Sequence, residues 1–240
     1  SHDLSLILTH EHTDFDALAS LLGAALLYPE YQAVLPRRMN RNVAEFVALY
    51  RAYLPFVAPD ELPKRKIGRI VLVDTRALNT PRGVAPNCQI MVIDHHVQPA
   101  PDGTEPSPRD PVYTIYAEPV GANATLLIER MVQARTALTT LQATLLALGI
   151  HEDTNSLTYG GSTARDAAAL AWLLEPERGV NQDLLVRFLN HPLSDEQRTL
   201  LQVLIESSEH FDARGLNIVI ATANASGRTE EISTVAARLR

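Results

Sequence analysis

Four short clusters of histidine and carboxylate residues stand out in the sequence. They are residues 10–16 (HEHTDFD), Asp74 in VDT, residues 94–96 (DHH) and residues 151–155 (HEDTN). Imidazole nitrogens and carboxylate oxygens without thiolate are the ligands that suit manganese, iron, cobalt or zinc better than calcium. The clusters therefore predict a divalent-metal site, provided that the fold brings them together.

Gathering these clusters would concentrate negative charge that only cations can balance. Four carboxylates would repel one another, and two divalent cations would neutralise their formal charge. Two metals about 3.5–4 Å apart are the usual clamp for phosphoryl hydrolysis. A lone aspartate at the end of a central strand, Asp74, is the natural bridge, with His10 and His95 as neutral ligands. The four carboxylates are Asp14, Asp16, Asp74 and Asp153.

The elements that must position these residues follow from the hydrophobic pattern. Short apolar runs predict strands at 4–9, 69–73, 89–93 and 113–117, and three clusters directly follow such runs. Helical patterns occupy 16–27, 40–54, 121–133, 138–148, 163–174, 182–189 and 194–211. This alternation predicts an α/β fold: a doubly wound, mainly parallel sheet with helices on both faces. Ligands bind outside the carboxyl ends of such strands.

The chain divides into three expected segments. Residues 1–190 form the catalytic domain, 191–215 a helical connector, and 216–240 the start of a second, truncated α/β domain. The chain opens with Ser-His and no methionine, and its last helical pattern still runs at Arg240, so we expect cut ends. Gln98–Pro111 carries five prolines and predicts an exposed loop.

Composition excludes several classes of protein. Apolar residues make up 46%, and no apolar run approaches the roughly 18 residues of a membrane helix. One cysteine, Cys88, excludes a disulfide framework and a cysteine-ligated zinc site. With no secretion leader, these features predict a cytoplasmic protein.

Charge is unevenly distributed along the chain. The net charge is −7, but residues 37–69 carry eight basic and three acidic side chains, a local +5. Such a stretch either steers a polyanion or is simply a solvated surface.

Each motif alone has an ordinary structural explanation. A strand-end aspartate such as Asp74 is often a cap or turn residue, and paired histidines also occur in loops. The ordered combination is what favours chemistry: H-x-x-x-D-x-D after a strand, a strand-end D, D-H-H after a strand, and an aspartate in G-I-x-x-D-T.

This combination resembles the four motifs of the DHH phosphoesterases over residues 4–190. That superfamily includes a single-strand-specific exonuclease, nano-RNA and pAp phosphatases, cyclic-dinucleotide phosphodiesterases and family II pyrophosphatases. The resemblance implies two manganese ions, with Mg²⁺ or Co²⁺ as alternatives. It implies that His96 touches the substrate phosphate, that Asp94 orients the histidines and that His12 is a spacer. The implied metal ligands are His10 and Asp14 for one ion, Asp16, His95 and Asp153 for the other, and Asp74 between them.

Two further stretches narrow the resemblance. Residues 160–166 (GGSTARD) are similar to the exonuclease and nano-RNase branch, which makes Arg165 a candidate phosphate contact. Its ordinary alternative is a helix-terminal salt bridge with Asp166. The opening of the chain and residues 36–50 resemble the N-terminal region of bacterial fusion proteins. Those proteins carry this domain ahead of CBS domains and a tRNA nucleotidyltransferase/poly(A) polymerase-like module, which this chain lacks.

We therefore expect a manganese-dependent phosphoesterase that acts on short single-stranded RNA, RNA 3′ ends or a nucleotide. A phosphatase for pAp, a cyclic dinucleotide or polyphosphate is the first alternative. A non-catalytic metal- or nucleotide-sensing module of a larger RNA-processing protein is the second. The sequence leaves the exact substrate, the oligomeric state and the role of residues 98–111 open.

Overall fold

The computed structural model describes residues 3–78, 83–97, 112–190, 192–224 and 232–238. The chain divides into two compact units, Ser1–Leu189 and Asn190–Arg240, and each is described by itself. The loop expected at 98–111 lies outside the described residues. No helix in the described ranges is long and apolar enough to cross a membrane.

A six-stranded sheet forms the centre of the first unit. Its strands lie in the order β3-β2-β1-β4-β5-β6, and every pairing between neighbours is parallel. The α/β fold with a mainly parallel sheet is therefore confirmed. Two strands were not predicted because β2 and β3 are too short to leave a hydrophobic pattern. The strands are β1 (Leu4–Leu8), β2 (Gln32–Val34), β3 (Phe56–Val57), β4 (Ile67–Val73), β5 (Val84–Asp94) and β6 (Val112–Ala117).

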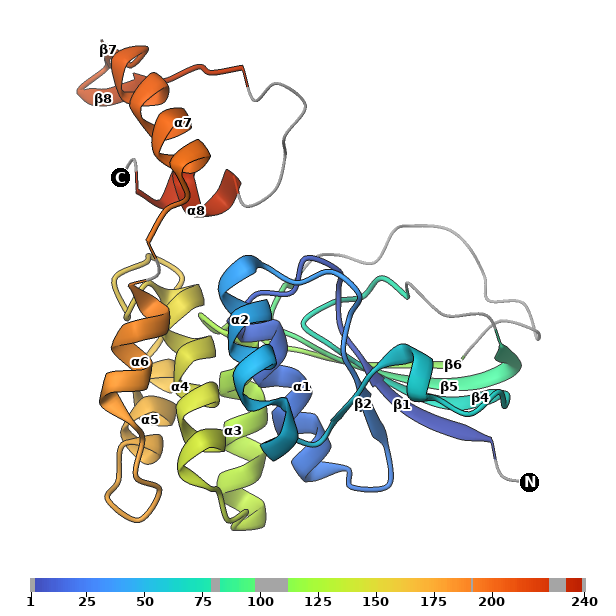
Figure 1. The fold of residues 1–240 in the computed structure, drawn as a ribbon. Helices are drawn as coiled ribbons and strands as arrows, with labels where there is room; N and C mark the ends of the chain where they lie inside the picture. Colours follow the sequence, from blue (N-terminus) through green and yellow to red (C-terminus); the bar gives the residue numbers. More distant parts are fainter. Residues whose placement is uncertain (1–2, 79–82, 98–111, 191, 225–231, 239–240) are drawn as a thin grey trace. The chain divides into compact units, whose positions relative to one another are not determined.

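The helices of this unit gather on one face of the sheet (Figure 1). One continuous hydrophobic cluster joins their buried side chains to Ile7, Val71 and Ile93 of the sheet. The helices are α1 (Phe15–Leu27), α2 (Arg41–Tyr50), α3 (Asn123–Ala134), α4 (Thr140–Thr154), α5 (Ala164–Leu173) and α6 (Gln182–Leu189).

The opposite face of the sheet has a smaller hydrophobic cluster. Its hydrophobic cluster consists of strand residues together with the partly buried Leu62 and Leu78, which lie in connecting segments. The β4–β5 and β5–β6 connections are described only in part. In the described parts of those connections, residues 74–78, 83 and 95–97, the chain forms no helix. Of the helices expected on both faces, the described residues show those on the first face.

Close packing of α1 against α4 positions the fourth cluster. A Cβ atom at Gly149 of α4 would lie 2.7 Å from the Ala19 Cβ of α1, so glycine permits this approach. The helix expected to end at residue 148 continues to Thr154, and Asn155, with φ 45°, ends it in the left-handed region. Asp153 therefore lies in the last turn of α4, and not beyond the helix as the sequence suggested.

The second unit contains a helix, a hairpin and a short final helix. They are α7 (Asp195–Glu206), β7 (Glu209–Ala213), β8 (Leu216–Ile220) and α8 (Ile232–Ala237). Strands β7 and β8 pair antiparallel through Arg214 and Gly215, both with positive φ. The helix expected to reach residue 211 thus ends at Glu206. Strand β7, inside the expected connector, pairs with the segment expected to start the second domain.

Candidate metal centre

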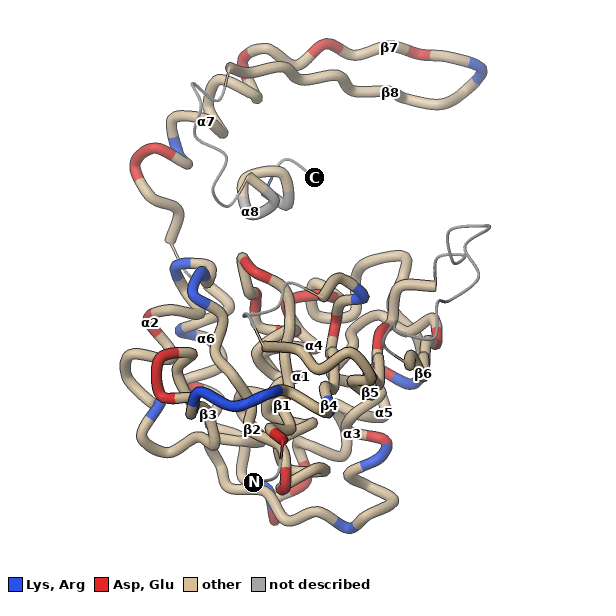
Figure 2. The backbone as a smooth tube through the Cα atoms, turned by 90° about the vertical axis from the view of Figure 1, so that its right-hand side faces the viewer, with Lys and Arg blue, Asp and Glu red and all other residues tan. Residues whose placement is uncertain are grey.

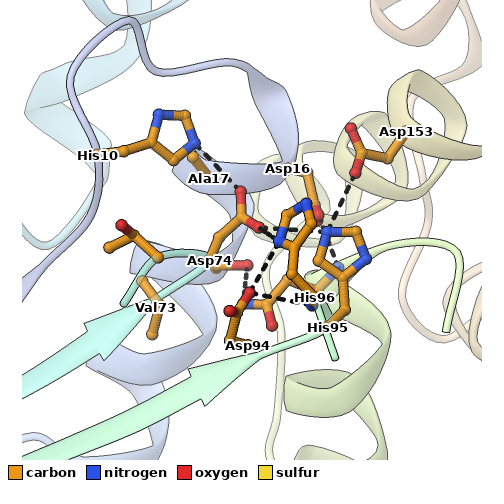
Figure 3. A network of polar contacts seen from close by, with 12 residues as sticks. His10, Asp16, Ala17, Val73, Asp74, Asp94, His95, His96 and Asp153 are labelled. Carbon is orange, nitrogen blue, oxygen red and sulfur yellow. Dashed lines mark hydrogen bonds and ion pairs between the residues drawn. The ribbon is translucent and has the colours of Figure 1, made fainter. Parts of the chain in front are cut away.

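The histidine and aspartate clusters meet at the carboxyl ends of β1, β4 and β5. The loop after β1 carries the first cluster, Asp74 follows β4, and Asp94 is the last residue of β5. The strand order reverses direction between β1 and β4, which is where open α/β sheets bind ligands. Figure 3 shows Asp74 between His10 on one side and His95 and Asp153 on the other.

One group of possible ligand atoms consists of His10, Asp14 and Asp74, all within 4.8 Å of one another. The Nε2 atom of His10 lies 3.3 Å from Oδ2 of Asp74. Its Nδ1 lies 2.8 Å from the Glu11 carbonyl oxygen, which leaves Nε2 to face the group. Asp14 caps α1 by accepting a hydrogen bond of 2.9 Å from the Ala17 backbone N–H. We call these three residues the first group.

A second group consists of Asp16, His95 and Asp153, again within 4.8 Å. The Nε2 atom of His95 lies 3.5 Å from Oδ2 of Asp153. Its Nδ1 lies 3.0 Å from the Val120 carbonyl oxygen, so Nε2 is again the atom directed inward. The fully buried Asp16 also accepts hydrogen bonds of 2.6 and 2.8 Å from the first two backbone N–H groups of α3. We call these three residues the second group.

Asp74 joins the two groups. Its Oδ1 lies 3.3 Å from Nε2 of His95. Both atoms are buried, and within the described residues neither has a hydrogen-bond partner. Asp74 also has φ 55°, a left-handed backbone that costs a non-glycine residue energy and often marks a functional site. A cation between these two atoms would satisfy both, so the donor set fits a metal.

The ionisation of the groups shows the same need for positive charge. Burial lowers the pKa of both His10 and His95, but Asp74, a backbone carbonyl and a further carboxylate together outweigh it and raise each pKa to about 9. Burial and neighbouring carboxylates raise the pKa of Asp153 to about 7 and that of Asp16 well above its ordinary value. Burial also acts to raise the pKa of Asp74, yet the two histidines hold it below its ordinary value. In the metal-free protein, protons therefore supply the charge that cations would supply.

His96 lies at the open side of this centre. Its ring nitrogen Nδ1 is 2.9 Å from Oδ1 of Asp94 and 3.9 Å from Oδ1 of Asp74. Its side chain is 60% exposed, whereas that of Asp94 is 2% exposed. The rings of His95 and His96 pack edge to face with centroids 4.1 Å apart. His96 is thus fixed through Nδ1 and accessible to a ligand through Nε2. The expected spacer, His12, is exposed and belongs to no ligand group among the described residues.

Arg165 forms ion pairs with two glutamates. Its guanidinium donates two hydrogen bonds to Glu129, of 2.7 and 2.6 Å, and one of 2.6 Å to Glu118. The expected pairing with Asp166 is wrong, because Asp166 accepts from Gly121 and Thr125 and also closes a capping box at the start of α5. Two carboxylates engage this guanidinium in the metal-free protein, and its role as a phosphate contact stays a prediction.

Two residues that the sequence did not single out support the centre. Glu152, beside Asp153, accepts a 2.5 Å hydrogen bond from the Phe15 backbone N–H, and burial raises the pKa of Glu152 to about 8. Arg76 donates to Asp94 across 3.1 Å. Glu152 lies inside the fourth cluster, and this position was the one feature of the sequence that could have pointed to its role. No feature of the sequence pointed to Arg76, because its partner Asp94 is 18 positions away.

The basic stretch at 37–69 does not form one surface. Arg37 pairs with Asp60 at 2.7 Å and Arg51 with Glu61 at 2.5 Å, which neutralises both. The exposed run 64–66 precedes β4 and so lies at the amino end of the sheet, opposite the metal centre; Figure 2 colours it blue. The fold therefore divides the stretch and leaves no single basic track leading to the centre.

Comparison with known proteins supports this organisation. Residues 5–150 match the family model described as "DHH family, N-terminal domain". Two curated relatives are A-adding tRNA nucleotidyltransferases, from Geobacter sulfurreducens (30% identical over 99% of this chain) and Aquifex aeolicus (32% over 96%). The chain spans 27% and 26% of their lengths, about a quarter.

Two solved structures share the fold. One is an exopolyphosphatase-related protein from Bacteroides fragilis, with a TM-score of 0.60, 16% identity, and coverage of 87% of this chain and 62% of that one. The other, from Methanococcus jannaschii, is provisionally named a family II inorganic pyrophosphatase. It has a TM-score of 0.56, 22% identity, and coverage of 90% and 70%. At these identities the likeness concerns the fold alone.

Proposed function

Because this chain belongs to the DHH family, we propose that it is a phosphoesterase that holds two divalent cations side by side. One observation carries the proposal. Two groups of ligand-type side chains lie next to each other, and Asp74 of the first comes within 3.3 Å of His95 of the second. The two facing atoms, the buried Asp74 Oδ1 and His95 Nε2, have no hydrogen-bond partners in the described structure.

Each group would hold one cation. His10 and Asp14 bind the first, and Asp16, His95 and Asp153 bind the second. Asp74 has Oδ2 3.3 Å from Nε2 of His10 and Oδ1 3.3 Å from Nε2 of His95, so it would contribute a ligand atom to each site. Manganese suits this mixed imidazole and carboxylate set, with magnesium or cobalt as alternatives. When bound, such a pair of cations activates water and polarises the phosphoryl group.

The remaining residues prepare the substrate position. His96, exposed and oriented through Asp94, presents Nε2 to a phosphate oxygen beside the centre. Asp94 acts through His96 and does not touch the substrate. Fixing the imidazole before the substrate arrives places its donor where charge develops, and this lowers the barrier.

The names of two relatives support a proposal for the substrate class. Two relatives over nearly the whole chain are named for adding A to tRNA. We propose a short single-stranded RNA or an RNA 3′ end as substrate. The chain spans about a quarter of these relatives, so the nucleotide-adding activity in their name is not assigned to it. The cytoplasmic location stays a prediction.

A second candidate is a metal- or nucleotide-binding module without hydrolytic activity, within a larger RNA-processing protein. The relatives' name favours it, because that name describes nucleotide addition and not hydrolysis. The complete ligand set argues against it, since a module that had lost activity would not need two adjacent groups linked by one carboxylate.

A hydrolysis panel distinguishes the candidates. The chain is supplied with Mn²⁺ and given 5′-labelled RNA oligomers of graded length, pAp, cyclic di-AMP, pyrophosphate and bis-p-nitrophenyl phosphate. Asp74→Asn, purified in parallel, is the control for contaminating nucleases. The proposal predicts cleavage of short RNA that Asp74→Asn abolishes. Preference for pyrophosphate or pAp would correct the substrate, and metal binding without turnover of any substrate would establish the binding module.

A further inference from the structure

We propose that Arg76 is the positioning residue that locks the Asp94–His96 turn against Asp74 and so sets the place of His96 beside the substrate phosphate. The geometric part of this inference is independent of catalysis. Its functional part rests on the proposed phosphoesterase activity.

The two loops that meet at the centre are joined by this one side chain. Nε of Arg76, in the loop after β4, lies 3.1 Å from Oδ2 of Asp94, the last residue of β5. A terminal nitrogen of the same guanidinium lies 2.5 Å from the carbonyl oxygen of His96. One rigid, planar group therefore holds both ends of the three-residue turn, which an ammonium cannot do.

Asp94 depends on this cation. It is 2% exposed and accepts three hydrogen bonds: from Arg76, from the His96 backbone N–H at 3.2 Å, and from the His96 ring at 2.9 Å. A carboxylate this buried that loses its charge partner is strongly destabilised. Arg76 therefore fixes the orientation of the exposed His96 ring indirectly, because it holds Asp94 and Asp94 holds the ring.

The backbone explains why Arg76 reaches this position. Asp74, two residues earlier, takes φ 55° and donates its N–H to the Ile93 carbonyl at 3.0 Å. The Thr75 hydroxyl then accepts from the Ala77 N–H at 3.1 Å, which closes a local turn. The same turn that points the Asp74 carboxylate between the two groups sends Arg76 toward β5. Placement of the bridge and placement of His96 are thereby coupled.

The geometric test is amide hydrogen exchange of His96 in the metal-free protein, measured by NMR. Arg76→Ala should speed exchange of this amide about tenfold, as the loss of a charge-assisted hydrogen bond implies. Arg51→Ala, which breaks the Arg51–Glu61 pair outside the centre, should leave it unchanged. Arg76→Lys, a milder change in case Arg76→Ala does not fold, should fall between. Unchanged exchange in both Arg76 variants overturns the proposal.

The functional test is hydrolysis of bis-p-nitrophenyl phosphate with Mn²⁺. We expect Arg76→Ala to keep its bound metal and lose about 10- to 100-fold in kcat, the usual cost of removing a residue that supports a metal site. Added guanidinium ion should restore part of the rate, which a purely structural defect would not permit. Wild-type kcat in a variant with faster exchange refutes the link to catalysis. If the wild-type chain hydrolyses nothing, the proposed function fails while the exchange test still decides the geometry.

Discussion

The two ligand groups of the centre are built in different ways. In the first, His10 and Asp14 come from one loop, and the His10 side chain is 29% exposed. In the second, Asp16, His95 and Asp153 come from α1, the end of β5 and the end of α4, and Asp16 is fully buried. The first group is therefore largely local, whereas the second exists only when α1, α3, α4 and β5 are packed. Asp74, a member of the first group, links it to the second through His95.

The largest expected effect comes from changing Asp74, the residue that links the two groups. Asp74→Asn takes away the charge that both cations require, so both should be lost and hydrolysis should fall at least about a hundredfold. Metal content after dialysis, measured by mass spectrometry, checks this. His12→Ala, on the same loop as the first group, is the matched control and should keep both metals. Retention of two metals by Asp74→Asn would show that the bridge is wrongly assigned.

Asp16→Ala should have the second-largest effect, because it removes a ligand from the second group and leaves the first group in place. Asp16 belongs to the second group and also accepts hydrogen bonds from the first two backbone N–H groups of α3. Its loss should remove the second cation and destabilise the manganese-loaded protein by about 3 kcal/mol, since two hydrogen bonds to a charged acceptor disappear. Denaturant unfolding with and without Mn²⁺ measures both effects. A folding free energy equal to that of His10→Ala would remove the distinction between the groups.

The stability of the metal-free protein should depend on pH. The folded, metal-free protein holds protons on His10 and His95 up to about pH 9 and on Asp153 up to about pH 7. Unfolded histidine and aspartate release theirs near pH 6.5 and 3.8. Stability without metal should therefore fall as pH rises from 6 to 9, because the folded state must give up protons that the unfolded state has already lost.

Bound Mn²⁺ replaces those protons and removes this loss. The increase in Tm caused by Mn²⁺ should thus be larger at pH 9 than at pH 6, and Mg²⁺ should give a smaller increase than Mn²⁺. Melting curves at the two pH values test this. An increase in Tm that does not depend on pH would mean that the cation does not displace these protons.

His10→Ala should have the smallest effect of these changes. It removes one ligand from the local, partly exposed first group and leaves the packing of α1 against α4 intact. We expect weaker binding of one cation, about 10- to 100-fold, with the second retained. Calorimetric titration with Mn²⁺ would resolve the two sites. Loss of both cations would mean that the groups are not separable.

The contrast between the groups also explains what sequence reasoning could reach. His10 and Asp14 are four residues apart after a strand, so a local pattern predicts their proximity. Asp74 and His95 were predicted because parallel strands end on one edge of the sheet. All six candidate ligands fall in the two groups, although their binding of metal remains a proposal.

What sequence reasoning missed depends on tertiary contacts. The partners of Arg165 are Glu118 and Glu129, which lie 47 and 36 positions away and follow from the packing of α5 beside α3. Arg76 meets Asp94 only because β4 and β5 are neighbours. The extension of α4 through Asp153 was hidden because its last residues are polar and break the apolar pattern.

The central claim is that one carboxylate, Asp74, joins two cation sites. Titration of the metal-free chain with Mn²⁺, followed by electron paramagnetic resonance of the loaded protein, tests it most directly. We predict two Mn²⁺ per chain with the spectrum of an exchange-coupled pair. A single Mn²⁺, or two with the spectra of isolated ions, would contradict the shared centre.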